Sequence, residues 1–302
     1  MSDRLIKFLF HAAPVRGGLV RVEDAWRQMV ERHDFPPVVT RLLGEMVSAA
    51  ALLATNIKFN GALIMQVHGD GPVKLLVVEC QPDLALRATA KLGDDAIDEQ
   101  ASLQQLINRG GRGRFAITLD PRNLLPGQQP YQGIVPLDGD SMARILEAYM
   151  RQSEQLETRL VLAANEEVSA GLLLQRLPED GGTAAKTDLD AWDRATTISA
   201  TLTQNELLEH EPETLLRRLY GQERIQLQAS YTPRFACTCS RERIGRMLIS
   251  LGREEVDSII DEMRIVTVTC DFCSRSYSFD AVDVAQLFAS GDTETTAPAT
   301  RH

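Results

Sequence analysis

The sequence predicts an α+β protein with a mostly antiparallel sheet and packed helices, then a helical linker, then a small C-terminal four-cysteine module. Three observations support this. Apolar residues between positions 22 and 54 recur at helical spacing, whereas short apolar runs follow them. Two of these runs flank Gly69-Asp70-Gly71-Pro72, a strong hairpin turn signal. Four of the five cysteines lie beyond position 236.

We expect the N-terminal α+β domain to occupy residues 1–178. Its predicted helices cover residues 22–33, 38–54, 102–108 and 141–152. Its predicted strands cover residues 5–13, 62–67, 73–80, 85–91, 114–119, 132–135, 155–162 and 168–175. The hairpin-length connections favour antiparallel pairing. The apolar stretch 42–57 carries Glu45 and is too short to span a bilayer, so no membrane association is expected.

A linker is predicted over residues 179–230, because a polar stretch begins at Pro178. Thr203 and Glu206 have capping-box spacing, Pro212 suits a first helical position and Gly221 suits a helix end. These helices are short, and the segment has ten acidic and five basic residues. Such helices are marginal in water unless they dock on another surface. The linker is therefore either a plain connector or a metastable segment that can undock.

A compact module is expected over residues 231–289, followed by a disordered tail over 290–302. Ser240 is a good N-cap for a helix that Gly252 ends, and a second helix follows it. The run 265–269 is a strand that delivers Cys270 to a hairpin tip, and 276–279 is its return strand. This arrangement is typical of a zinc knuckle.

The thiol pairs Cys237-Thr-Cys239 and Cys270-Asp-Phe-Cys273 can together hold one zinc ion in tetrahedral geometry. They can equally close into two short disulfides. Four sulfur ligands leave no open position for substrate water, so hydrolytic zinc catalysis is not expected. The histidines are scattered along the chain and do not compete as ligands.

Zinc would dominate the stability of so small a module. A core of this size contributes only ~3–5 kcal/mol, whereas structural zinc contributes an apparent ~10–16 kcal/mol. Zinc-bound cysteines are thiolates, the form that oxidants attack. From the chemistry alone, both an inert structural site and a redox switch remain open.

Composition excludes several other functions. The formal net charge of −10 disfavours nonspecific binding to nucleic acids or anionic membranes. Cys80 ends an apolar run and is expected to be buried and unreactive. We find no Ser/His/Asp triad and no paired-carboxylate site, so no enzymatic activity is expected. Without a convincing export signal, the clustered cysteines favour metal or redox chemistry in the cytoplasm.

The sequence leaves two alternative functions, each less favoured. A thiol-disulfide oxidoreductase would place Cys270-Asp-Phe-Cys273 at a helix N-terminus, but here a strand precedes the motif. A zinc-ribbon nucleic-acid binder would need positive charge, but residues 231–290 contain seven basic and nine acidic residues.

Several motifs together resemble the 33 kDa heat-shock protein family of redox-regulated holdase chaperones. In the C-terminal part they are Phe235-Ala-Cys237-Thr-Cys239-Ser-Arg-Glu-Arg243, Leu251-Gly-Arg-Glu-Glu255, Cys270-Asp-Phe-Cys273 and Tyr277-Ser-Phe279. In the N-terminal part they are Gly71-Pro-Val-Lys-Leu-Leu76 and Tyr131-Gln-Gly-Ile-Val-Pro-Leu137. The resemblance covers nearly the whole chain except the tail after Ala289. Ser274 and Met263 are small departures that affect nothing central.

This resemblance implies a function and a set of site residues. Reduced protein would bind one Zn²⁺ per chain through Cys237, Cys239, Cys270 and Cys273 and be inactive as a chaperone. Oxidation would form Cys237–Cys239 and Cys270–Cys273 disulfides, release zinc and unfold the module. The linker would lose its support and help to expose a surface for unfolded client proteins. Members of the family act without ATP and are active as homodimers.

Overall fold

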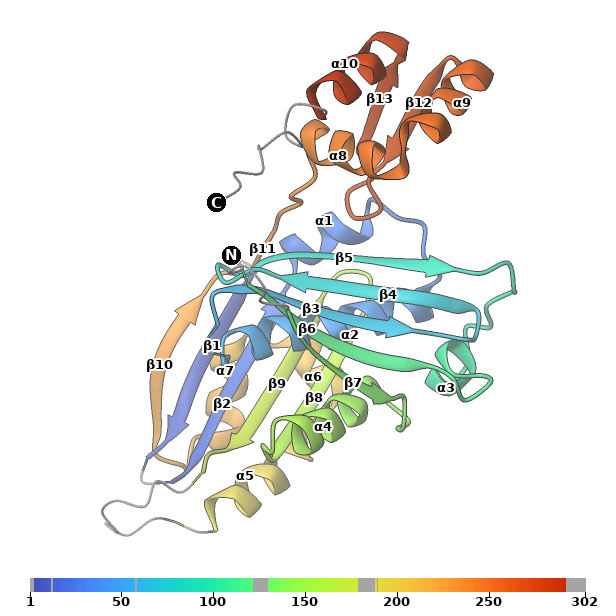
Figure 1. The fold of residues 1–302 in the computed structure, drawn as a ribbon. Helices are drawn as coiled ribbons and strands as arrows, with labels where there is room; N and C mark the ends of the chain where they lie inside the picture. The colour runs from blue at the N-terminus through green and yellow to red at the C-terminus, as the bar shows by residue number, and fades with distance from the viewer. Residues whose placement is uncertain are drawn as a thin grey trace, which may run out of the picture. The chain divides into compact units, whose positions relative to one another are not determined.

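The computed structural model in Figure 1 describes residues 3–11, 13–57, 59–121, 130–178, 188 and 190–291. The chain divides into two compact units, Met1–Ala236 and Cys237–His302. The polar stretch that begins at Pro178 lies outside the described residues from position 179 to 187. The tail predicted over 290–302 lies outside them from residue 292, and residues 290 and 291 instead end a helix.

The first unit contains two sheets, and the predicted α+β class is confirmed. The five-stranded sheet has the order β10 (Ile225–Tyr231), β1 (Arg4–Phe10), β2 (Val15–Val22), β9 (Ser169–Arg176) and β8 (Thr158–Ala164). The six-stranded sheet has the order β11 (Arg234–Phe235), β5 (Ala85–Leu92), β4 (Val73–Cys80), β3 (Gly61–His68), β6 (Arg114–Pro121) and β7 (Tyr131–Pro136). All neighbouring strands are antiparallel except β11 and β5.

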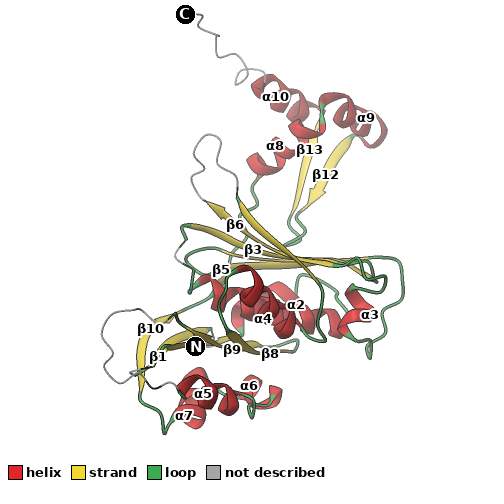
Figure 2. Ribbon diagram, turned by 60° about the horizontal axis from the view of Figure 1, so that its bottom comes forward, coloured by secondary structure: helices red, strands yellow, loops and turns green. Residues whose placement is uncertain are grey.

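Helix α2 (Pro37–Ala54) lies between the two sheets and contacts strands of both (Figure 2). Pro37 occupies the start of this helix, where a missing N–H costs nothing. Among the described residues, α2 is the one helix long and apolar enough to cross a membrane, but 78% of it is buried inside the protein. That burial is typical of a core helix. The other helices here are α1 (Asp24–Val30), α3 (Leu103–Ile107) and α4 (Met142–Ser153).

Three short helices cover the opposite face of the five-stranded sheet (Figure 2). They are α5 (Ala191–Ser199), α6 (Gln204–Glu209) and α7 (Pro212–Tyr220). Thr203 and Glu206 form the predicted capping box. Pro212 begins α7 and Gly221 is its C-cap, as expected. The apolar side chains of these helices and of the sheet form a hydrophobic core separate from the one around α2.

Two strands of this sheet were not expected from the sequence. Strand β2 contains Gly17-Gly18, and glycine is disfavoured in strands. The structure explains Gly17, because a Cβ atom there would clash with the ring of Phe8 on the paired strand β1. Strand β10 lies within the segment expected to be helical, and its alternating polar residues hide its pairing with β1. The linker therefore leads into the sheet rather than straight into the cysteine module.

The second unit combines helices α8 (Arg241–Leu251), α9 (Arg253–Met263) and α10 (Ala281–Gly291) with the hairpin β12 (Ile265–Thr269) and β13 (Ser276–Asp280). Ser240 caps α8 by accepting a hydrogen bond from the Arg243 amide at 3.2 Å. Gly252 has φ +96°, so it separates α8 from α9 without strain. Helix α10 was not expected. The described part of the second unit has a core of five buried apolar residues: Leu248, Val256, Val266, Phe279 and Val284.

Candidate metal centre

Strands β12 and β13 form a hairpin (Figure 1), and Cys270 and Cys273 lie in the turn between them. The amide of Cys270 donates to the carbonyl of Arg275 at 2.9 Å, and the amide of Ser274 donates to the carbonyl of Cys270 at 2.8 Å. Ser274 takes a left-handed conformation, with φ 56°, which turns the chain directly after Cys273. This tight turn places both sulfurs on the same side of the tip.

The other two cysteines lie in the segment that precedes α8. Cys237, Thr238 and Cys239 have no regular secondary structure, and the N-cap Ser240 follows them at once. The Arg243 guanidinium donates to Thr238 Oγ1 at 2.9 Å, which fixes the segment against the first turn of α8. The helix start therefore positions this thiol pair.

The structure brings the four predicted residues together. The sulfurs of Cys237, Cys239, Cys270 and Cys273 all lie within 4.8 Å of one another. The Cys237–Cys270 sulfur distance is 3.7 Å and the Cys239–Cys273 distance is 3.4 Å. A tetrahedral zinc site with bonds of about 2.3 Å has sulfurs about 3.8 Å apart. The cluster can therefore hold a metal ion with only small side-chain shifts.

The thiols do not share one electrostatic environment. Burial raises the pKa of Cys239, but hydrogen bonds from Tyr277 and the other thiols outweigh it and lower that pKa to about 7. The Tyr277 hydroxyl donates to Cys239 Sγ at 3.1 Å. Burial, together with hydrogen bonding to the neighbouring sulfurs, raises the pKa of Cys273 to about 12. The site thus favours a thiolate at Cys239, the form that both metals and oxidants require.

Two residues around the cluster could not be assigned a role from sequence. Tyr277 faces Cys239 because it lies on β13, and the register of β13 with β12 is visible only in the structure. Arg241 on α8 donates to the carbonyl of Ser278 at 2.7 Å and pairs with Asp283 of α10 at 2.7 Å. Its guanidinium also lies 4.2 Å from the centre of the Phe279 ring. Arg241 therefore ties α8 to the hairpin and to α10.

Three other features of the described residues form no comparable cluster of possible metal ligands. Cys80 is fully buried, and burial strongly raises the pKa of its thiol, so it is unreactive as expected. The Gly110–Arg114 stretch is a turn, held by Asp70, which accepts from the amides of Gly110 and Arg112 at 3.1 and 3.0 Å. The acidic group Asp94, Asp95, Asp98 and Glu99 is exposed. All five cysteines lie in the described part of the chain, and none forms a disulfide.

Comparison with known families identifies the chain's relatives. The model of the family described as Hsp33 protein matches residues 3–280. The chain belongs to the Hsp33 family. Hsp33 relatives described as 33 kDa chaperonin include one from Methylobacillus flagellatus, 44% identical over 291 residues and covering 96% of each chain. Another, from Chromobacterium violaceum, is 46% identical and covers 95% of this chain and 94% of its own.

A solved Hsp33 structure agrees with this assignment. The crystal structure of the 33 kDa chaperonin from Thermotoga maritima superposes with a TM-score of 0.78 at 18% identity. It covers 96% of this chain and 99% of its own length, so the fold is shared throughout. Membership in the Hsp33 family supports a role as a chaperone in the stress response.

Proposed function

We propose that this protein is a redox-regulated, ATP-independent holdase that binds unfolding proteins in the cytoplasm under oxidative stress. Cys237, Cys239, Cys270 and Cys273 hold one zinc ion in the reduced, inactive protein. The observation that carries this proposal is the convergence of these four sulfurs within 4.8 Å in a chain of the Hsp33 family. Zinc bound there would cross-link the hairpin tip to the segment before α8.

Oxidation by a peroxide is the proposed signal. A thiolate attacks the O–O bond to give a sulfenic acid, and the neighbouring sulfur of the same pair then displaces water. Formation of each disulfide, Cys237–Cys239 or Cys270–Cys273, removes two electrons from its pair of thiols. One hydrogen peroxide accepts them with two protons and becomes two waters. Sulfurs joined in disulfides no longer serve as ligands, so oxidation is coupled to zinc release.

Loss of the metal should unfold the cysteine module. Among its described residues, five apolar side chains are fully buried in its core and seven more are partly buried against them. A core of this size contributes ~3–5 kcal/mol, whereas a structural zinc ion contributes an apparent ~10–16 kcal/mol. The predicted division into a core domain (1–178), a linker (179–230) and a redox module (231–289) is part of this proposal. In it, the linker is released when the module unfolds.

The face that the linker helices cover is a suitable surface for clients. The strands and the turn before β9 contribute ten buried apolar residues to the core beneath these helices: Ile6, Phe8, Phe10, Val15, Leu19, Ala163, Val168, Ala170, Leu172 and Leu174. If α5–α7 undock, this sheet face and the apolar sides of the helices become accessible together. Large exposed apolar patches are typical of protein-binding sites.

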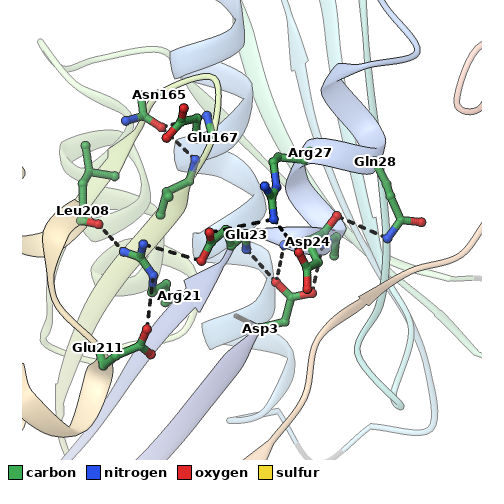
Figure 3. A network of polar contacts seen from close by, with 12 residues as sticks. Asp3, Arg21, Glu23, Asp24, Arg27, Gln28, Asn165, Glu167, Leu208 and Glu211 are labelled. Carbon is green, nitrogen blue, oxygen red and sulfur yellow. Dashed lines mark hydrogen bonds and ion pairs between the residues drawn. The ribbon is translucent and has the colours of Figure 1, made fainter. Parts of the chain in front are cut away.

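The polar side-chain contacts between helices α5–α7 of the described linker and the sheet centre on Arg21 (Figure 3). The Arg21 guanidinium on β2 donates to the carbonyl of Leu208 and lies 3.8 Å from the Glu211 carboxylate. It also lies 3.6 Å from Glu23. Arg4 pairs with Glu213 at 2.5 Å, but both side chains are largely exposed. Exposed pairs contribute little stability, so the linker depends mainly on apolar burial. Dependence on apolar burial rather than on ion pairs supports the proposal that helices α5–α7 can be released.

The proposal is tested by light scattering from a heat-unfolding client protein. We expect suppression of aggregation by protein treated with warm peroxide, and none by reduced, zinc-loaded protein. Oxidised protein should also be a homodimer with no bound zinc. Full zinc occupancy in the peroxide-treated, active protein would contradict the switch. Equal suppression by both forms would leave a chaperone with a merely structural metal site.

Tyr277→Phe is expected to weaken zinc binding by about 10- to 100-fold, because hydrogen bonds to metal ligands orient them and tune their charge. The substitution removes only the hydroxyl that donates to Cys239. Competition with a chromophoric zinc chelator measures the change. Ser276→Ala on the same strand is the control, since Ser276 Oγ contacts Thr269 rather than a thiol. An unchanged affinity in Tyr277→Phe would show that this hydrogen bond does not support the metal.

A further inference from the structure

A cavity of about 150 Å³ lies between the two sheets of the first unit, at the C-terminal end of helix α2. Strands β2 and β9 of the five-stranded sheet line it, together with β6 of the six-stranded sheet and helix α4. On their strands, Arg16 and Gln175 of its lining alternate with Val15 and Leu174, which belong to the core beneath α5–α7. The cavity is therefore on the opposite face of this sheet from the linker helices.

Apolar side chains make up the larger part of the cavity wall. They are Leu53, Ile57, Ile117, Leu119, Met150 and Leu156. In another protein, an engineered cavity of about 150 Å³ with a lining of Leu, Ile and Phe stays dry and binds benzene. The wall of this cavity therefore suits an apolar group of about six carbons.

Arg16 brings an uncompensated positive charge to this wall. Its Nε donates to Gln175 Oε1 at 2.9 Å, and Gln175 Nε2 donates to Thr158 Oγ1 at 3.1 Å. These bonds orient the guanidinium, but its two outer nitrogens have no hydrogen bond or ion pair to a residue that the structure describes. Burial lowers the pKa of Arg16. Glu154 also lines the cavity, but it is exposed and accepts from the Tyr149 hydroxyl at 3.4 Å.

Lys7 adds a second positive charge beside Arg16. It pairs with Gly18 across β1 and β2, which places it on the same face of the sheet as Arg16. Its ammonium group donates to the carbonyl of Thr55, directly after α2. Burial, together with the charge of Arg16, lowers the pKa of Lys7. Among the described residues, neither cation has a carboxylate within ion-pair distance, so an anion bound here would relieve their repulsion.

Asn56 contributes an acceptor that lacks a donor. Its Nδ2 donates to the carbonyl of Leu52 at 3.2 Å, which sets the orientation of the amide. Its Oδ1 is buried and has no hydrogen-bond partner within the described part of the chain. Buried polar atoms are normally satisfied. Because Asn56 lines the cavity, a hydroxyl group of a bound molecule can supply the missing donor.

We propose that this cavity binds a small carboxylic acid with an apolar body of about six carbons and a hydroxyl group. The carboxylate accepts from the Arg16 guanidinium, the apolar body fills the space between the sheets, and the hydroxyl donates to Asn56 Oδ1. Hydrogen bonds between charged groups are the stronger ones, so Arg16 supplies most of the selectivity for an acid. The proposal does not rest on the holdase function, because the site is separate from the face covered by α5–α7.

Methyl NMR of the reduced, zinc-loaded full chain, titrated with benzoate, tests this site. We expect a Kd on the order of 1 mM for so small a ligand. The methyl signals of Ile57 and Ile117 should shift, whereas those of Ile259 in the second unit should not. Phenol has the same ring without the carboxylate and should bind about 10-fold more weakly or worse. Among the three monohydroxybenzoates, at least one should bind roughly 10-fold more tightly than benzoate.

Three variants complete the experiment. Arg16→Met keeps an apolar stem and should weaken benzoate binding by about 10- to 100-fold, with little effect on phenol. Leu119→Phe fills the cavity and should abolish binding of both. Arg151→Gln removes an exposed cation of α4 that does not line the cavity, so it should bind benzoate as the unmodified protein does.

The proposal is overturned if benzoate binds no more tightly than phenol, or if Arg16→Met retains the full affinity for benzoate. Shifts scattered over the surface rather than at Ile57 and Ile117 would also overturn it. Equal affinity for benzoate and all three hydroxybenzoates would remove the role given to Asn56. If Arg16→Met folds poorly, the comparison of benzoate with phenol and the Leu119→Phe variant still decide. None of these results affects the peroxide test, so the two proposals can fail separately.

Discussion

Cys270→Ser is expected to abolish zinc binding and unfold the C-terminal unit, while the first unit stays folded. The reason is that zinc contributes much more stability to this unit than its apolar core does. The metal contributes an apparent ~10–16 kcal/mol, several times what a core of five buried side chains supplies. Zinc content, together with loss of exchange protection in α8, α9 and β12, measures the effect. Chelation of the metal from the unmodified protein should give the same result.

Cys80→Ala is the matched control for this experiment. It removes a buried thiol in β4, outside the metal cluster, so it should keep full zinc content and a folded C-terminal unit. If Cys270→Ser instead lost its metal but kept α8 and α9 protected, the apolar core alone would suffice. The metal would then not control the fold of this unit.

Tyr220→Ala is expected to undock the linker and to activate the reduced, zinc-loaded protein. Tyr220 is 1% exposed and packs edge-on against Phe10 at a centroid distance of 5.2 Å. Its hydroxyl donates to the carbonyl of Ala195 at 3.1 Å, which joins α7 to α5. Truncation of a buried aromatic side chain costs about 3–5 kcal/mol. Limited proteolysis between residues 190 and 220 should accelerate, and client aggregation should be suppressed without oxidation.

Tyr220→Phe provides the comparison. It keeps the ring and loses only the hydrogen bond, at a cost of about 1 kcal/mol. We expect it to remain docked and inactive until oxidised. If proteases cleaved the Tyr220→Ala protein along its whole length, as they cleave an unfolded chain, the substitution would have unfolded the entire first unit. Helix α7 would then belong to the stable core of that unit. A proteolysis pattern confined to α5–α7 distinguishes the two outcomes.

Local rules predicted much of this fold from sequence. The caps at Ser240 and Thr203 and the turn at Gly69–Pro72 depend on neighbouring residues alone, and each appears where expected. Strands β2 and β10 were missed because their reasons are not local. Gly17 is required by the ring of Phe8 on another strand, and β10 is a strand because β1 offers it an edge.

The same distinction applies to the candidate site. The spacing within each thiol pair is a local signal, and it indicated all four cysteines. The meeting of Cys239 with Cys273 depends on how α8 packs against the hairpin, and the spacing of the cysteines does not contain that information. The contact of Tyr277 with Cys239 likewise needs the strand register.

The pairing of β10 with β1 has a kinetic consequence. Strand β9 ends at Arg176 and β10 begins at Ile225, and both belong to the same sheet. If α5–α7 leave their face as proposed, the segment therefore stays tethered at both ends. A tethered segment rebinds at an effective concentration in the millimolar range, so it acts as an intramolecular competitor of any client. Restoring the thiols would then displace bound chains by mass action alone, with no need for an external energy source.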